Sequence, residues 1–240
     1  MKIVFCIACV LVCFASGLAQ EKSIDRSEFD ALTQNSNHPI ARWPGKKSFR
    51  RTTITESRAE GVSPAPESAK WTKNFSTKSV SEYAIDSKTY HFISETSGEA
   101  PQKRETVKVG GLVYTRVGSG PWTKTAGEAA PKTPPPYTPP PSRFENLSTE
   151  TSYAYLGTET YKNATVRTYQ KVEKRQMVNK ETGKPAESVA TTKLWIAEDG
   201  TLLRTDFKSD LKDGELSSSL YSLEEFELDP SITITAPEVS

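Results

Sequence analysis

The chain consists largely of short segments in which apolar and polar residues alternate, a pattern typical of β-strands with one buried face. Turn sequences rich in glycine, asparagine and aspartate separate many of these segments. The expected strands are residues 49–56, 80–85, 88–94, 104–109, 112–117, 151–160, 164–172, 189–197, 201–207 and 216–228. Because short turns join most of them, the pattern predicts a single antiparallel meander.

Two of the turns contain glycines that are expected to adopt a positive φ. Gly110 begins the Gly110-Gly111 pair between two expected strands, and Gly200 ends a turn that also contains Asp199. Tight hairpins use this backbone region, which residues with a Cβ rarely adopt. These two positions therefore indicate where the strands reverse.

A short helix is expected at residues 24–32, before most of the strands. Ser23 is a suitable N-cap, and Ile24, Phe29 and Leu32 share one face at helical spacing. One helix of this length is too small to cover the apolar face of a sheet of about ten strands. The sheet must therefore close on itself, dimerise or hold an apolar ligand.

Residues 1–19 have the order of a secretory signal peptide. Lys2 supplies a positive charge before the apolar run 3–14, and small residues then lead to Ala19, after which the chain becomes polar. The apolar run is too short for a membrane anchor, which needs about 20 residues. We therefore expect export, with residues 20–240 forming one domain that contains no transmembrane segment.

The cysteines support this interpretation. All three lie within the expected signal peptide, so the mature chain has no disulfide and no thiol nucleophile. A lipid anchor needs a cysteine directly after a small residue at the cleavage point, whereas Cys13 follows the bulky Val12. Extracellular eukaryotic domains of this size often carry disulfides. The pattern favours a bacterial periplasmic or secreted protein without a lipid anchor.

The charge pattern argues against two classes of partner. The formal net charge of +1 falls to zero when the signal peptide removes Lys2, and acidic and basic residues alternate along the rest of the chain. No basic or acidic run provides an electrostatic surface for a charged polymer. Neither nucleic acid nor an anionic membrane surface is therefore indicated.

Residues 125–143 differ in composition from the rest of the chain. They contain two Pro-Pro-Pro triplets, which cannot donate ladder hydrogen bonds and favour extended polyproline II. We interpret this segment as an inserted loop that forms a stiff surface crossing or a flap.

No catalytic or metal-binding pattern is recognisable in the mature chain. It has only His38 and His91, which stand without clustered acidic residues, so neither a zinc site nor another cofactor is expected. The sequence has no Gly-x-Ser-x-Gly elbow and no glycine-rich phosphate loop before a helix. The acidic stretch 224–229 is better explained as a solvated strand end than as a glycosidase pair. We therefore expect no enzyme, and a hydrolase with an unrecognised site stays an alternative.

Aromatic residues occur on nearly every expected strand. They are favoured in strands and in cores, but side chains that converge from different hairpins would also line an apolar cavity. The residues nominated for such a cavity are Tyr83, Phe92, Tyr114, Trp122, Tyr153 and Trp195. The alternation leaves open which side of the sheet forms the cavity, because Leu194 and Ile196 lie opposite Trp195.

Several motifs follow one another in a distinctive order. They are the hairpin at 104–116 with Gly120-Pro121-Trp122 after it, residues 155–160 with Tyr169 after them, the Leu-Trp-Ile…Asp-Gly…Leu-Leu-Arg hairpin at 194–204, and residues 232–237. Together they resemble the LolA/LolB-like (mycobacterial lipoprotein-like) superfamily of envelope proteins. The resemblance implies a mainly β, α+β fold: an antiparallel meander curled into an incomplete barrel, with one or two helices covering a cavity for lipid or acyl chains.

These observations predict a non-enzymatic exported protein that binds a lipid or another apolar molecule in the cavity of a half-barrel domain at residues 20–240. The alternative is an envelope protein that binds a protein partner through the face or the edge of its sheet. Bound lipid in the purified protein would favour the first interpretation over the second.

The signal peptide gives the first testable prediction. We expect processing after Ala19, so that the exported protein begins at Gln20. Intact mass spectrometry of the exported protein checks this. A species that retains residues 1–19, or one with a diacylglyceryl group on Cys13, would contradict it.

Overall fold

The computed structural model describes residues 22–34, 48–60, 74–84, 89–98, 101–126, 142–214 and 216–239. The predicted signal peptide, His38 and the expected turn at Asp86 and Ser87 lie outside these ranges. The same holds for residues 127–141 of the proline-rich segment.

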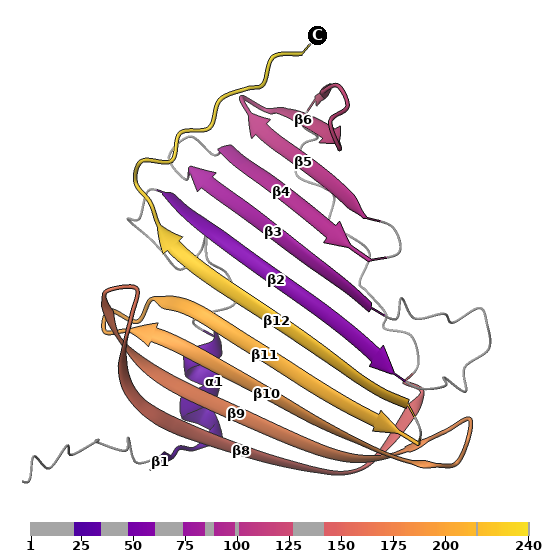
Figure 1. Cartoon of the computed structure of the whole chain (residues 1–240). Helices are drawn as coiled ribbons and strands as arrows, with labels where there is room; N and C mark the ends of the chain where they lie inside the picture. Colours follow the sequence, from indigo (N-terminus) through magenta and orange to yellow (C-terminus); the bar gives the residue numbers. More distant parts are fainter. Residues whose placement is uncertain are drawn as a thin grey trace, which may run out of the picture.

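The described residues form one helix, α1 (Arg26–Gln34), and twelve strands. The strands are β1 (Lys22–Ser23), β2 (Ser48–Glu60), β3 (Asn74–Ala84), β4 (Thr89–Ser97), β5 (Gln102–Val109), β6 (Leu112–Val117), β7 (Thr123–Ala126), β8 (Phe144–Tyr161), β9 (Ala164–Asn179), β10 (Pro185–Ala197), β11 (Leu202–Asp213) and β12 (Leu216–Leu228). All of them belong to one antiparallel sheet that is not closed into a barrel (Figure 1). The predicted fold class, mainly β with an incomplete barrel, is confirmed.

The order of the strands shows that the sheet is built from two meanders. Strands β2 to β7 follow one another at one end and β8 to β12 at the other, and β12 pairs with β2 to join them. The joining ladder runs from Ser217 opposite Glu60 to Leu228 opposite Phe49. The last strand of the chain therefore connects the two halves of the sheet.

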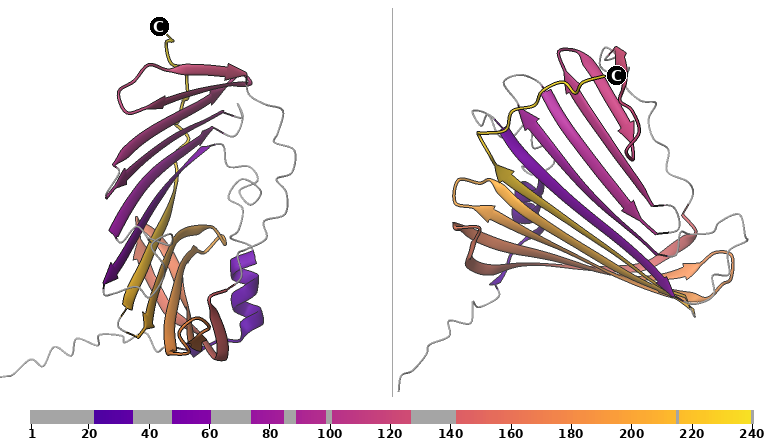
Figure 2. Two further views of the ribbon diagram at one scale, coloured as in Figure 1. Left: turned by 90° about the vertical axis from the view of Figure 1, so that its right-hand side faces the viewer. Right: turned by 45° about the horizontal axis from the view of Figure 1, so that its top comes forward.

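Helix α1 lies on the concave side of the sheet, against strands of the second meander (Figure 2). Its Phe29 is buried in a core that also contains residues of β2 and β9 to β12: Phe49, Tyr169, Leu194, Ile196, Leu202 and Phe226. Ile24, Leu32, Tyr83, Tyr153 and Tyr155 pack around this core. The helix side of the sheet is therefore the core side at this end.

The start of the helix corrects one prediction. Ser23 is not the N-cap, because it lies in β1 opposite Ala154 and holds the chain extended. Asp25 takes this role instead: its Oδ1 accepts hydrogen bonds from the Glu28 amide at 2.8 Å and the Ser27 hydroxyl at 2.7 Å. The same hydrogen bonds lower the pKa of Asp25. The helix consequently begins two residues later than expected.

Several strands are longer than the alternating pattern indicated, and two were not predicted. Strands β8 and β9 extend into polar sequence at residues 144–150 and 173–179, where neither side of the strand is clearly apolar. The short edge strands β1 and β7 were missed for the same reason. Strand β7 includes Thr125 and Ala126, so the proline-rich insertion is shorter at its start than predicted.

Two β-bulges interrupt the pairing of β8 with β9. The register shifts between Asn146 and Ser148 and again between Tyr155 and Gly157. A bulge exchanges the faces of the residues that follow it. The second bulge turns Glu159 away from the side on which Tyr155 lies.

A buried polar cluster closes the far end of the second meander. The Asp213 carboxylate accepts hydrogen bonds from Arg143 at 2.9 Å and from the Asn179 side-chain amide at 2.8 Å. The Asn179 side-chain oxygen accepts two backbone amides of the following turn, at Glu181 and Thr182. These bonds tie the start of β8 to the ends of β9 and β11, and they satisfy polar groups that would be costly to bury alone.

The hairpin glycines give the second prediction. Gly110 and Gly200 have φ of 58° and 82°, as predicted, and a Cβ at either position would meet nothing within 4 Å. Valine at either position should therefore cost about 1 kcal/mol or more of unfolding free energy through backbone strain alone. Urea denaturation of the two variants measures this cost. Gly110→Asn is the control, because asparagine tolerates this region and should cost less; valine variants as stable as the wild type would contradict the assignment.

Candidate functional site

The strand register divides the side chains between two faces of the sheet, because directly paired residues point to the same side. We call the side that packs on α1 the helix face and the other side the outer face. A row on the helix face crosses five strands from β2 to β6: Phe49, Tyr83, Tyr90, Lys108 and Val113. The neighbouring row on the outer face contains Arg50, Glu82, His91, Val107 and Tyr114.

The six nominated aromatic residues fall on both faces, so they do not converge on one cavity. Tyr83, Phe92 and Tyr153 lie on the helix face. Tyr114 and Trp195 lie on the outer face, where Trp195 pairs with Arg204 rather than with the core. Trp122 follows β6, and the guanidinium of the outer-face residue Arg116 lies 4.7 Å from its ring centroid.

An aromatic row on the helix face begins in the core and extends beyond it. Phe49 is 1% exposed and stacks on Tyr83 with ring centroids 4.7 Å apart. Tyr83 in turn contacts Tyr90 at 6.3 Å, and both tyrosines are partly buried. The row thus continues from the helix-covered core onto β4, where Tyr90 is paired with Lys108.

Next to this row, the helix face becomes more polar. Phe92 on β4 is paired with Ser81 and Thr106, both of which are buried. Phe92 itself is partly buried. Together with the row, it forms a surface of aromatic rings bordered by small hydroxyl side chains.

At the other end of the helix face, aromatic rings close against α1. Phe29 contacts Tyr153 at 5.3 Å between ring centroids, and Tyr155 contacts Tyr169 at the same distance. Burial raises the pKa of Tyr169. These rings belong to the covered core, so Tyr153 has a packing role in the described part of the chain.

The outer face carries a ladder of charged side chains across β2 to β6. His91 lies between two carboxylates: its Nε2 is 2.8 Å from Glu105 and its Nδ1 is 3.4 Å from Glu82. Arg50 donates to Glu82 at 2.8 Å and Arg116 donates to Glu105 at 2.7 Å. Burial favours the neutral form of Glu105, but hydrogen bonds from His91 and Arg116 outweigh it and lower its pKa.

A second outer-face cluster surrounds Arg204 on β11. Its guanidinium lies 4.8 Å from the Trp195 ring and 5.8 Å from the Tyr161 ring, and it donates to Asp206 at 2.7 Å. Burial and the carboxylate of Glu225, which accepts the hydroxyl of Tyr161, raise the pKa of Tyr161 to about 12.

The bulge in β8 completes this cluster. It brings Glu159 to the outer face, where its carboxylate accepts the Trp195 indole N–H at 2.5 Å and the Thr168 hydroxyl at 2.8 Å. Both polar and cationic groups therefore hold the Trp195 ring in place.

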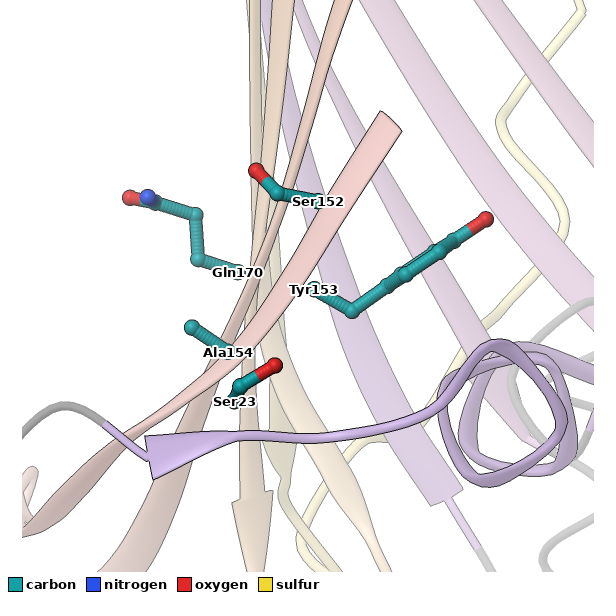
Figure 3. Close-up of a pocket in the computed structure, with 5 residues that line it drawn as sticks. All are labelled: Ser23, Ser152, Tyr153, Ala154 and Gln170. Atoms are coloured by element: carbon teal, nitrogen blue, oxygen red, sulfur yellow. The ribbon is translucent and has the colours of Figure 1, made fainter. Parts of the chain in front are cut away.

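A depression of about 280 Å³ lies where β1 pairs with β8. It is lined by Ser23, Ser152, Tyr153, Ala154 and Gln170, and Figure 3 shows Tyr153 pointing to the side opposite Ser152, Ala154 and Gln170. The lining is mostly small and polar and does not include the aromatic row. We therefore place the candidate site at the aromatic row instead.

Within the described ranges, no three His, Cys, Asp or Glu side chains are arranged to hold a metal ion. In the same part of the chain, no helix has the length and hydropathy needed to cross a membrane.

Lys108 was not among the predicted site residues, although the sequence contains a signal for its position in the hairpin. The Gly110-Gly111 turn sets the register of its hairpin, which pairs Lys108 with Val113 and Val107 with Tyr114. That register already places Lys108 and Tyr114 on opposite faces of the sheet. The pairing of Tyr90 with Lys108 was not readable, because it depends on the connection between β4 and β5.

The charged ladder gives the third prediction. Glu105→Gln should lower the unfolding free energy at pH 7 by about 1–3 kcal/mol, because it leaves His91 and Arg116 without their carboxylate. The folded state lowers the pKa of Glu105 from 4.5. The contribution of the carboxylate is therefore fully present above that value and is lost as the pH falls through the folded pKa.

Urea denaturation of the wild type and Glu105→Gln from pH 7 to pH 2 checks this prediction, and the difference between them should shrink toward low pH. Glu95→Gln is the matched control, since Glu95 forms an exposed ion pair with Lys103 on the same face. Its effect at pH 7 should be smaller. A difference for Glu105→Gln that is independent of pH would show that the carboxylate is not held as described.

Comparison of the sequence with known proteins gives no match, so the function is inferred from the geometry of the structure. The sequence matches no protein-family model, and no curated protein matches it.

Proposed function

We propose that this chain is a non-enzymatic exported protein that binds a lipid or another apolar molecule on the helix face, beside α1. The observation that carries the proposal is the aromatic row that begins in the core at Phe49 and continues through Tyr83 to the partly exposed Tyr90. Binding sites for apolar molecules are concave, mostly apolar and bordered by a few polar groups. The aromatic row, Phe92 and the neighbouring hydroxyl side chains supply both kinds of surface.

The strength of such binding would come from the burial of methylene groups. Each buried CH₂ contributes about 0.8 kcal/mol, so about eight of them contribute roughly 6 kcal/mol before the cost of association. Because Phe49 is buried, the accessible part of the row runs from Tyr83 through Tyr90 to Lys108. It crosses two strand spacings of about 4.8 Å each, which gives roughly 10 Å of surface. A medium-length acyl chain fits along a surface of this size.

The fold supports the proposal in a coarser way. An open, curved antiparallel sheet with a helix on its concave side is the architecture implied by the resemblance to the LolA/LolB-like superfamily. Membership of that superfamily, and location in the periplasm or the medium, are parts of the same proposal. They rest on the motif order and on the signal-like residues 1–19.

A second candidate function is protein binding through the outer face. Trp195, Arg204 and Tyr161 form one stacked cluster there, and Arg116 stacks on Trp122. Tryptophan, tyrosine and arginine dominate the binding energy of many protein interfaces. Trp195→Ala should therefore abolish the binding of a protein partner, whereas it should not affect the binding of an apolar ligand on the helix face.

The fourth prediction tests the apolar site with a neutral ligand, 1-decanol. Tyr90→Trp places an indole at the end of the aromatic row, and its emission should shift to the blue when 1-decanol is added. Tyr90→Ala should weaken binding about fivefold or more, because it removes one ring of the row. Fluorescence and calorimetric titrations provide the two measurements.

Tyr221→Trp is the matched control, because Tyr221 is a partly buried tyrosine on the outer face of β12. When 1-decanol is added, the emission of Tyr221→Trp should change no more than the emission of the wild type, which reports the native tryptophans alone. An identical response of both variants, together with the absence of lipid in extracts of the purified protein, would overturn the proposal.

A further inference from the structure

The two faces of the first meander differ sharply in charge. All acidic residues of β2 to β7 point to the outer face by register: Glu56, Glu60, Glu82, Glu95 and Glu105. The helix face of the same strands carries three cations, Arg51, Arg104 and Lys108. Arg51 is neutralised by Glu224 of β12, which leaves the two cations of β5.

Lys108 lies at the end of the aromatic row. It is directly paired with Tyr90, and its side chain is partly buried. Within the described ranges it forms neither an ion pair nor a hydrogen bond through its ammonium group. Its other direct neighbour in the row is Val113. The apolar row thus ends at a cation that has no carboxylate partner among the described residues.

Arg104 lies on the same face of β5, two helix-face positions from Lys108. Four residues along a strand separate the two Cα atoms by about 13 Å. Arg104 is paired with Ser94 and Val117, and it also forms no ion pair within the described ranges. Long flexible side chains at this spacing can both reach an anion placed between them, near Thr106.

From this arrangement we infer that the ligand is a single-chain or multi-chain lipid with an anionic head group, and that Lys108, with Arg104, binds that group. The inference rests on the proposed function and adds the head-group chemistry to it. The chain lies along Tyr83 and Tyr90, which are partly buried, and the carboxylate or phosphate lies at β5. A neutral or cationic head group at this position would leave the two cations uncompensated.

The charged ladder on the outer face leaves these cations available to an external anion. Glu82 and Glu105 are already bound by Arg50, His91 and Arg116 on the opposite side of the same strands. They consequently neither face nor neutralise Lys108. The sheet separates paired charges on one face from unpaired cations on the other.

The fifth prediction compares decanoate with 1-decanol, which have equal chain lengths and differ in charge. The intact mature protein should bind decanoate about tenfold more tightly at pH 7, as measured by calorimetry. Lys108→Gln should remove most of this preference, and Lys108→Gln combined with Arg104→Gln should abolish it. Binding of 1-decanol should change much less than binding of decanoate in both variants, because the alcohol carries no charge for the two cations to recognise.

Lys103→Gln is the matched control, because Lys103 lies on the same strand but on the outer face, paired with Glu95. It should keep the full preference for decanoate, and urea denaturation confirms that each variant is folded. Equal binding of both ligands by the wild type would overturn the head-group inference and leave the proposed function standing. An equal loss in Lys103→Gln, or a preference that survives the double substitution, would overturn it as well.

Two further outcomes distinguish failure of the proposed function from failure of the head-group inference. If neither ligand binds, the proposed function fails, and the inference fails with it. If the protein binds phosphatidylglycerol vesicles but not free decanoate, the cations recognise a membrane surface rather than one lipid molecule, which also overturns the inference.

Discussion

The antiparallel ladder between β12 and β2 is the interaction on which the arrangement of this molecule depends. It joins two meanders that are otherwise formed from strands adjacent in sequence. Through it, Phe49 of β2 lies next to Phe226 and the other residues that enclose α1. Without this ladder, Tyr83 and Tyr90 would form a separate patch instead of a continuation of the core. The position of the candidate site is therefore set by the contact between the two meanders in the middle of the sheet.

The second organising feature is the segregation of side chains by face. On the first meander, the outer face contains cations and carboxylates that neutralise one another across strands, whereas the helix face contains aromatic rings, hydroxyl groups and unpaired cations. Cross-strand pairs of opposite charge stabilise such a face. On the helix face Arg51 has such a partner in Glu224 of β12, whereas the partly buried Lys108 has none among the described residues. A partly buried cation without a partner costs stability unless another group compensates it. That cost is the physical reason for expecting an external anion there.

Much of the fold was predictable because local signals specify it. The glycine turns and the alternation within Leu216–Leu228 set strand ends that the structure reproduces. The long ends of β8 and β9 were not predictable, since strand pairing and the buried polar cluster at Asn179, rather than an apolar face, hold them in the sheet. The site was predictable only in part: the aromatic residues were identified, but their faces were not. Trp195 between Leu194 and Ile196 shows why, because parity separates these residues without saying which side meets the helix.

The two bulges in β8 have a consequence for how the molecule behaves among other chains. Strand β8 is a long strand next to the edge of the sheet, and among the described residues β1 and Ile24 cover it only from Tyr153 to Tyr155. A long, flat edge would offer its free amides and carbonyls as a template for a strand of another molecule, which is how many β-proteins aggregate. The register shifts at Asn146 and at Tyr155 break this edge into short pieces, and Glu145, Glu150 and Glu159 place negative charges along it. The bulges and these charges thus disfavour the addition of a foreign strand to the edge of an open sheet.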